Sequence, residues 1–238
     1  MKSAVLVFCL LCSNRLIAQH GSVIVELFTS QGCSSCPAAD KNLTDAIALA
    51  EKQGDPIIGL SFHVDYWNHI GWKDPYSSKL FTQRQRDYSE AMNLESLYTP
   101  QMIVNGKREF VGSDKAALND AVLVARKQAS TFQIWIHGLK MEDDNLSFQY
   151  EVNGLPTDEV IHFAIVERGV ENYVPRGENS GRKLHHDNVV RFFNTKSLLQ
   201  KDQVSLSLKN SLFQKLNLIL YIQDKSMQVM GATQEKIR

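Results

Sequence analysis

The chain has 238 residues, with 26 basic and 26 acidic side chains and a hydrophobic share of 43%. A net charge of zero gives no basic surface for nucleic acid, so we expect no nucleic-acid partner. The composition is that of a globular protein, and the length allows one large or two small domains.

The first 18 residues have the pattern of a secretory signal peptide. Lys2 precedes an apolar run at 4–11, which is too short to span a bilayer, and Ala18 stands at a plausible cleavage site. We therefore expect a secreted or periplasmic protein without stable membrane insertion. A cytosolic or membrane-tethered chain is the alternative. Removing residues 1–18 leaves only two of the four cysteines, Cys33 and Cys36.

These two cysteines form a C-x-x-C motif between a predicted buried strand at 23–29 and a predicted helix from 33 to about 52. A helix N-terminus stabilises a thiolate through its free N–H groups and its dipole. The position predicts that Cys33 is an exposed, low-pKa, attacking thiol and that Cys36 is the buried resolving thiol. A permanent disulfide and a metal site are the alternatives.

A second apolar strand at 56–62 completes a βαβ unit with parallel strands, and an insert follows at 63–98. His63 and Asp65 come directly after this strand, where open α/β sheets carry their sites. They could tune Cys33, relay a proton or, for His63, complete a metal site with both sulfurs. The favoured interpretation is that they anchor the insert. Its aromatic residues, Tyr66, Trp67 and Trp72, are predicted core residues, with a substrate-binding wall as the alternative.

A third strand is predicted at 98–104, a returning strand at 107–111 and a helix at 114–128. The resulting order, β-α-β-insert-β-β-α, resembles the thioredoxin fold. In that fold a cis-proline faces the cysteines at the position of Pro100. The resemblance implies a cis Thr99–Pro100 bond, with Thr99 backbone groups available to an extended substrate peptide.

The second half of the chain shows the period-2 pattern of antiparallel strands. The predicted strands lie at 131–137, 146–152, 159–166, 189–193, 204–208 and 216–222. They indicate an all-β sandwich-like domain at 131–238. Between two of them lies a polar, glycine-bearing segment with Arg176, Arg182 and His186. We expect it to be a solvated loop. The alternative is that it packs over the C-x-x-C face, where these three residues would tune Cys33.

Four blocks of the sequence carry a resemblance to a known family: ELFTSQGCSSCPAAD, FHVDYWNHIGWKDP, YTPQMIVNG and RGENSGRKLHHDNVVR. They look like the secreted thioredoxin-like proteins of the DUF1223 family. The resemblance spans nearly the whole mature chain and implies fold and location better than activity, because the family's function is unknown.

Together these features predict an α/β thioredoxin-like domain at 21–130 followed by the sandwich-like domain at 131–238. The favoured function is an exported thiol–disulfide oxidoreductase without a cofactor, acting on exported thiol or disulfide proteins or small thiols, with an unknown redox partner. One alternative is a copper- or other metal-handling protein that uses Cys33, Cys36 and His63. Another is a non-enzymatic binding module in which the disulfide only stiffens a loop.

Overall fold

The computed structural model describes residues 21–54, 57–208 and 214–237. The predicted signal peptide at 1–18 lies outside these residues. The first half contains β1 (Val23–Thr29), α1 (Cys36–Gln53), β2 (Ile57–His63), the short 3-10 helix η1 (Asn68–Ile70), α2 (Lys79–Ala91), β3 (Gln101–Val104), β4 (Arg108–Val111) and α3 (Lys115–Ala125). The second half contains β5 (Ile134–Glu142), β6 (Asn145–Val152), β7 (Val160–Glu167), β8 (Val170–Tyr173), β9 (Lys183–His186), β10 (Val189–Ser197), β11 (Lys201–Ser207), β12 (Leu216–Gln223) and β13 (Val229–Lys236).

One large mixed sheet runs through both halves of the chain, in the order β13-β12-β7-β10-β2-β1-β3-β4. β1 pairs in parallel with β2, as the βαβ pattern predicts, and antiparallel with β3. The link between the halves is a parallel contact of β10 with β2, where Val189 pairs with Ser61. The fold is therefore mixed α/β, and the division at residue 130 stays a prediction.

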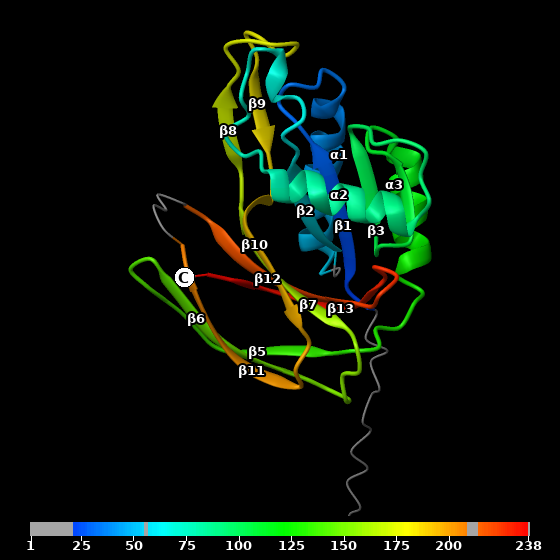
Figure 1. Ribbon diagram of the computed structural model, residues 1–238, viewed down its shortest axis with the longest axis vertical. Helices are drawn as coiled ribbons and strands as arrows, with labels where there is room; N and C mark the ends of the chain where they lie inside the picture. The colour runs from blue at the N-terminus through cyan, green and yellow to red at the C-terminus, as the bar shows by residue number, and fades with distance from the viewer. Residues whose placement is uncertain (1–20, 55–56, 209–213, 238) are drawn as a thin grey trace, which may run out of the picture.

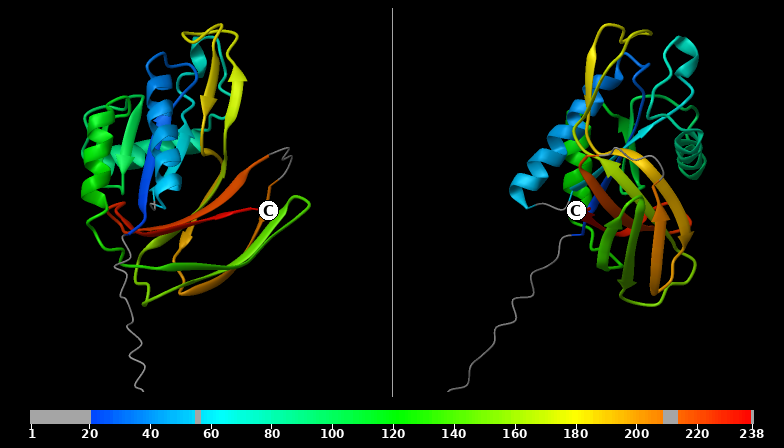
Figure 2. Two further views of the ribbon diagram at one scale, coloured as in Figure 1. Left: turned by 180° about the vertical axis from the view of Figure 1, so that it is seen from behind. Right: turned by 90° about the vertical axis from the view of Figure 1, so that its left-hand side faces the viewer.

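The N-terminal part of this sheet is covered on both faces, which explains why β1 and β2 are buried along their whole length. α1 and α3 lie on one face and α2 on the other (Figure 2). Ala39, Leu43 and Ile47 of α1 recur at helical spacing and are buried against β1 and β3.

The C-terminal part of the large sheet packs against a second sheet of three strands, in the order β11-β6-β5 (Figure 1). The alternation predicted for β6 is confirmed, since Leu146, Phe148, Tyr150 and Val152 are buried. These side chains form one apolar core with those of β7 and β12. Sequence reasoning missed β8, β9 and β13, which are short or have few apolar residues.

A buried ion pair ties α2 to both halves of the large sheet. Arg84 of α2 donates from Nε to Glu26 Oε1 of β1 at 2.8 Å, and the two side chains are 5% and 0% exposed. The Tyr221 hydroxyl of β12 donates to the same carboxylate at 2.8 Å, and Tyr88 donates to its other oxygen. The two charges are thus paired with each other and hydrogen-bonded to buried hydroxyl groups.

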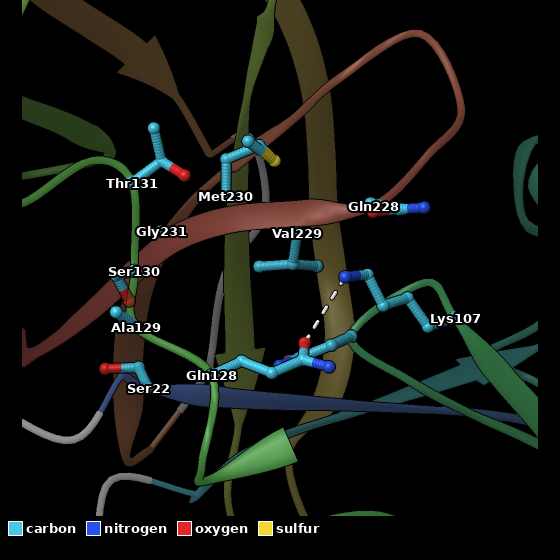
Figure 3. A pocket seen from close by; sticks show the side chains of 11 residues that line it. Ser22, Lys107, Gln128, Ala129, Ser130, Thr131, Gln228, Val229, Met230 and Gly231 are labelled. Atoms are coloured by element: carbon cyan, nitrogen blue, oxygen red, sulfur yellow. Dashed lines mark hydrogen bonds between the residues drawn. The ribbon is translucent and has the colours of Figure 1, made fainter. Parts of the chain in front are cut away.

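A polar pocket of about 340 Å³ lies at the N-terminal end of β1, where residues of both halves of the chain line it (Figure 3). Lys107 spans it and donates to Gln128 Oε1 at 3.3 Å. Beside it, Gly106 has a φ of 65°, and a Cβ there would lie 1.8 Å from the Met227 carbonyl oxygen. Close contact of the β3–β4 turn with the segment before β13 therefore requires glycine. Within the described residues, no helix is long and apolar enough to cross a membrane.

Replacing Arg84 with Met should destabilise the protein by about 3–5 kcal/mol, because the Glu26 carboxylate would stay buried without its partner. Urea unfolding followed by circular dichroism measures this change. Arg86, an exposed residue on the same helix, is the matched control, and Arg86→Met should cost less than about 0.5 kcal/mol. Equal stabilities of the two variants would contradict the assigned role of the ion pair.

Candidate functional site

The C-x-x-C motif lies in the turn that connects β1 to α1. Cys33 and Cys36 form a disulfide, with their Cα atoms 5.4 Å apart. The helix begins at Cys36 rather than at the predicted Cys33, so Cys33 belongs to the preceding turn and its N–H donates to the Ser30 carbonyl at 3.2 Å. Ser34 and Ser35 between the cysteines are exposed.

Both cysteines are buried, with 1% of Cys33 and none of Cys36 exposed. The prediction of an exposed Cys33 is therefore wrong for this disulfide-bonded structure. The position at the helix start is as expected, but two segments remote in sequence cover the turn. One is the loop between β8 and β9, and the other is the insert between β2 and α2.

The β8–β9 loop covers the disulfide turn through direct hydrogen bonds. The amide of buried Asn179 donates from Nδ2 to the carbonyl oxygens of Gln31 and Cys33, both at 2.9 Å. Glu178 Oε2 accepts from the Ser34 N–H at 2.9 Å. The favoured interpretation of 176–186 as a solvated loop is thus wrong, because the Asn179 amide and the Glu178 carboxylate bond directly to backbone groups of the turn.

The charged side chain of this loop that binds the backbone of the turn is none of the three predicted residues, Arg176, Arg182 and His186. Arg176 is exposed, and Arg182 donates from Nη1 to Asn179 Oδ1 at 2.7 Å, which orients the amide toward the turn. The charged group that binds the turn is the Glu178 carboxylate. Hydrogen bonds from Ser34 lower the pKa of Glu178, so this carboxylate is ionised at neutral pH.

The insert contributes two partly buried tryptophans to the same surroundings. Trp67 donates from Nε1 to Thr99 Oγ1 at 2.7 Å, and a Cβ on Gly32 would lie 3.1 Å from the Trp67 Cβ. Trp72 donates from Nε1 to Gln31 Oε1 at 3.1 Å. Trp67 packs against an apolar core, as predicted, and both indoles lie beside the disulfide turn.

The predicted cis bond between Thr99 and Pro100 is confirmed. Pro100 is buried directly before β3, whose first residue, Gln101, pairs with Phe28 near the end of β1. The bond therefore lies at the sheet edge from which the Cys33 turn departs. The Thr99 hydroxyl is already engaged by Trp67.

Two buried acid–base pairs lie at the same edge of the sheet. His63 Nδ1 is 2.7 Å from Asp74 Oδ2, and His186 Nδ1 is 3.4 Å from Asp40 Oδ1. The imidazole rings of His63 and His186 pack edge to face, with centroids 4.7 Å apart. All four side chains are at most 3% exposed. Such a concentration of buried titratable groups is a mark of functional sites.

The pKa values of two of these groups are shifted by their surroundings. Burial alone would lower the pKa of His186, but the carboxylates of Asp40 and Asp74 reverse this effect and raise it above 6.5. Burial alone would raise the pKa of Asp74, yet the nearby His63 and hydrogen bonds from backbone N–H groups lower it. The surroundings of His186 and Asp74 thus favour the charged forms of these two groups despite their burial.

The predicted site residues divide into two groups in the structure. His63 and His186 lie in the buried cluster, whereas Asp65 accepts from the Thr82 hydroxyl at 2.6 Å and anchors α2, as the favoured interpretation holds. Among the residues that the structure describes, no three His, Cys, Asp or Glu side chains are grouped so that they could hold a metal ion. The metal site of Cys33, Cys36 and His63 therefore gains no support.

Sequence reasoning missed several polar residues of the site: Gln31, Asp40, Asp74, Asn172, Glu178 and Asn179. Asp40 had a usable signal, because it falls on the apolar stripe of α1 between Cys36 and Leu43, and a polar residue within such a stripe is buried. The others lie in turns and loops, where local sequence does not indicate which segment they contact.

Comparisons with a family model and with solved structures each found a match. The family model of DUF1223, a protein of unknown function, matches residues 24–223. The crystal structure of protein AGR_C_4864 from Agrobacterium tumefaciens is similar over 91% of this chain and 95% of that one, with 27% identity and a TM-score of 0.66.

A β-glucosidase from Kluyveromyces marxianus matches 46% of this chain and 14% of its own at 16% identity, with a TM-score of 0.24, which is too low to carry an argument. No curated protein matches the chain. Because the family model covers most of its length, the chain belongs to the DUF1223 family.

Proposed function

We propose that this protein is an exported, thioredoxin-like thiol–disulfide oxidoreductase in which Cys33 exchanges with the substrate and Cys36 resolves the mixed disulfide. The observation that carries the proposal is the Cys33–Cys36 disulfide at the start of α1, directly beside a cluster of buried histidines and carboxylates. A disulfide that only stiffens a loop has no need of such a cluster. The substrates would be small thiols or the thiols and disulfides of exported proteins.

The reaction follows from the order of the two cysteines. A substrate thiolate attacks Cys33 Sγ, the Cys33–Cys36 bond breaks, and its electron pair leaves on Cys36 Sγ. In the opposite direction, Cys36 attacks the mixed disulfide and releases the reduced substrate. Cys33 belongs to the turn, whereas Cys36 is the first residue of α1 and has none of its surface exposed. Cys33 is therefore the sulfur that a substrate reaches first.

The substrate must displace part of the cover before it can react, because Cys33 is only 1% exposed. The β8–β9 loop is held on the turn by the hydrogen bonds of Asn179 and Glu178. Such bonds contribute about 0.5–1.5 kcal/mol each, since water replaces them on opening. Movement of this loop would thus give access at a moderate free-energy cost.

A non-enzymatic binding module with a structural disulfide is the second candidate, and the burial of both sulfurs favours it. Equilibration with a glutathione redox series separates the two functions. A redox-active pair should interconvert reversibly between disulfide and dithiol in the folded protein. A disulfide that stays oxidised throughout the series, and opens only when the protein unfolds, would favour the structural role and contradict the proposed exchange.

We predict that Cys36→Ser traps a mixed disulfide with a small thiol, whereas Cys33→Ser does not, because Cys33 belongs to the turn and Cys36 is the first residue of α1, with none of its surface exposed. Incubation of each variant with oxidised glutathione, followed by intact-protein mass spectrometry, measures the adduct. The two single variants serve as matched controls for each other. Equal adduct formation, or more adduct on Cys36, would contradict the assignment of the attacking thiol.

We predict that Asn179→Ala speeds reduction of the disulfide by dithiothreitol about thirtyfold, because two hydrogen bonds worth about 2 kcal/mol together no longer hold the cover. The fluorescence of Trp67 and Trp72 beside the turn provides a readout of the rate. Ser180→Ala is the control, since the hydroxyl of this exposed neighbour donates to the Pro175 carbonyl within its own loop. A rate equal to that of Ser180→Ala would show that the loop does not limit access.

A further inference from the structure

The N-terminal end of α1 carries a carboxylate that comes from the β8–β9 loop. The first N–H groups of a helix have no partner within the helix and form the positive end of its dipole, which favours an anion. α1 supplies no anion of its own, because its first turn holds no acidic residue and Ser35 at its N-cap makes no side-chain hydrogen bond. Instead, Glu178 Oε2 accepts from the Ser34 N–H at 2.9 Å, across 144 residues of sequence.

The Cys33 sulfur lies at the same end of the helix. Its Sγ is 3.3 Å from Ser35 Oγ, and Ser34, which binds Glu178, is the next residue in the chain. In the disulfide this sulfur has no charge, so it does not compete with the carboxylate. A thiolate at a helix start is stabilised by the N–H groups there and destabilised by a like charge nearby. The carboxylate and a Cys33 thiolate are therefore two anions that need the same donors.

We propose that Glu178 makes the β8–β9 loop redox-sensitive: the loop closes over the neutral disulfide, and a thiolate on Cys33 displaces it. This inference rests on the exchange reaction proposed above and adds the regulation of its site. A dithiol that reduces the protein is oxidised to its own disulfide and passes two electrons and two protons to Cys33 and Cys36. Cys33 then loses its proton to water, and the resulting charge repels Glu178. The oxidised site is thus shielded, and the reduced site is accessible.

The cations of the loop do not cancel this repulsion. Arg182 donates from Nη1 to Asn179 Oδ1 at 2.7 Å, so its charge supports the amide. Lys183 pairs with Glu171 at 2.6 Å, and Arg176 is exposed. Although Arg182 would attract a thiolate, it contacts the turn through the amide, whereas the carboxylate of the loop is bonded to the turn directly.

The other carboxylates near the turn have imidazole partners. Asp74 in the insert accepts from the Gln31 N–H at 2.8 Å and lies 2.7 Å from His63 Nδ1. Asp40 on α1 lies 3.4 Å from His186 Nδ1. Both carboxylates are buried and held in place. The carboxylate from the loop is exposed, so it can move into water when a second negative charge forms beside it.

The coupling between the thiolate and the loop is reciprocal. If the thiolate weakens the contact of the loop, the contact disfavours the thiolate by the same factor. Glu178→Gln keeps an oxygen that can accept from the Ser34 N–H but removes the charge. In a Cys36→Ser background, where Cys33 is a free thiol, this change should lower the pKa of Cys33 by at least about 0.5 unit. The Cβ chemical shift of Cys33, followed by NMR as the pH is varied, measures this pKa.

The test of the loop itself is the solvent exchange of the Asn179 side-chain amide, which is bonded to the turn while the loop is closed. NMR follows this exchange in Cys36→Ser, and the double variant Cys33→Ser, Cys36→Ser is the reference without a thiol. Below the pKa of Cys33 the two proteins should exchange at the same rate. Above it, Cys36→Ser should exchange at least about fivefold faster, because its thiolate opens the loop. The Trp67 Nε1–H, which donates to Thr99, is the internal control and should not change.

Two glutamate variants locate the effect. Glu178→Gln should abolish the difference, while Glu171→Gln, an exposed residue on β8, should retain it. In the wild-type protein, reduction with a phosphine should speed the same exchange at high pH. Equal exchange of the two cysteine variants above the pKa, or a difference that survives Glu178→Gln, would overturn the redox-sensitive loop. Because the variants need no substrate, a wild-type disulfide that glutathione never opens would instead contradict the exchange function.

Discussion

Gln31 is the residue on which the architecture of the site depends. Its N–H donates to Asp74, its carbonyl accepts from Asn179, and its side chain bonds to Trp72 and Asn172. These partners lie between 41 and 148 residues away in the chain. One buried side chain two residues before Cys33 therefore joins the insert and the β8–β9 hairpin to the disulfide turn. A buried amide satisfies all its groups only in one arrangement, which gives such a contact its specificity.

The sheet topology explains how such distant segments reach the same place. β10 pairs with β2 where Val189 meets Ser61, so β10 begins beside the strand that carries His63. The hairpin of β8 and β9 lies directly before that contact and extends along the N-terminal end of α1 (Figure 1). The second half of the chain therefore contacts the site through the β8–β9 hairpin, which directly precedes β10.

Patterns in the nearby sequence predicted the elements whose conformation depends mainly on neighbouring residues. The strand, turn and helix around Cys33 and the cis bond before β3 follow from apolar periodicity and from the family resemblance. The cover of the disulfide could not be predicted in this way, because nothing near Asn179 indicates its contact with Cys33 across 146 residues. The exposure expected of Cys33 was wrong for the same reason. Burial is a property of the whole fold, whereas helix position is a property of the nearby sequence.

The chemistry of the cover decides between a permanent and a reversible closure. The β8–β9 loop contacts the disulfide turn through hydrogen bonds that Asn179 donates and Glu178 accepts, with tryptophans at the side. An apolar cover would lose its full burial free energy on opening, about 25 cal/mol for each Å² exposed. A polar cover exchanges its bonds for bonds to water and loses about 0.5–1.5 kcal/mol for each. A hairpin held in this way can populate an open minor state, which a substrate that binds the open form would then stabilise.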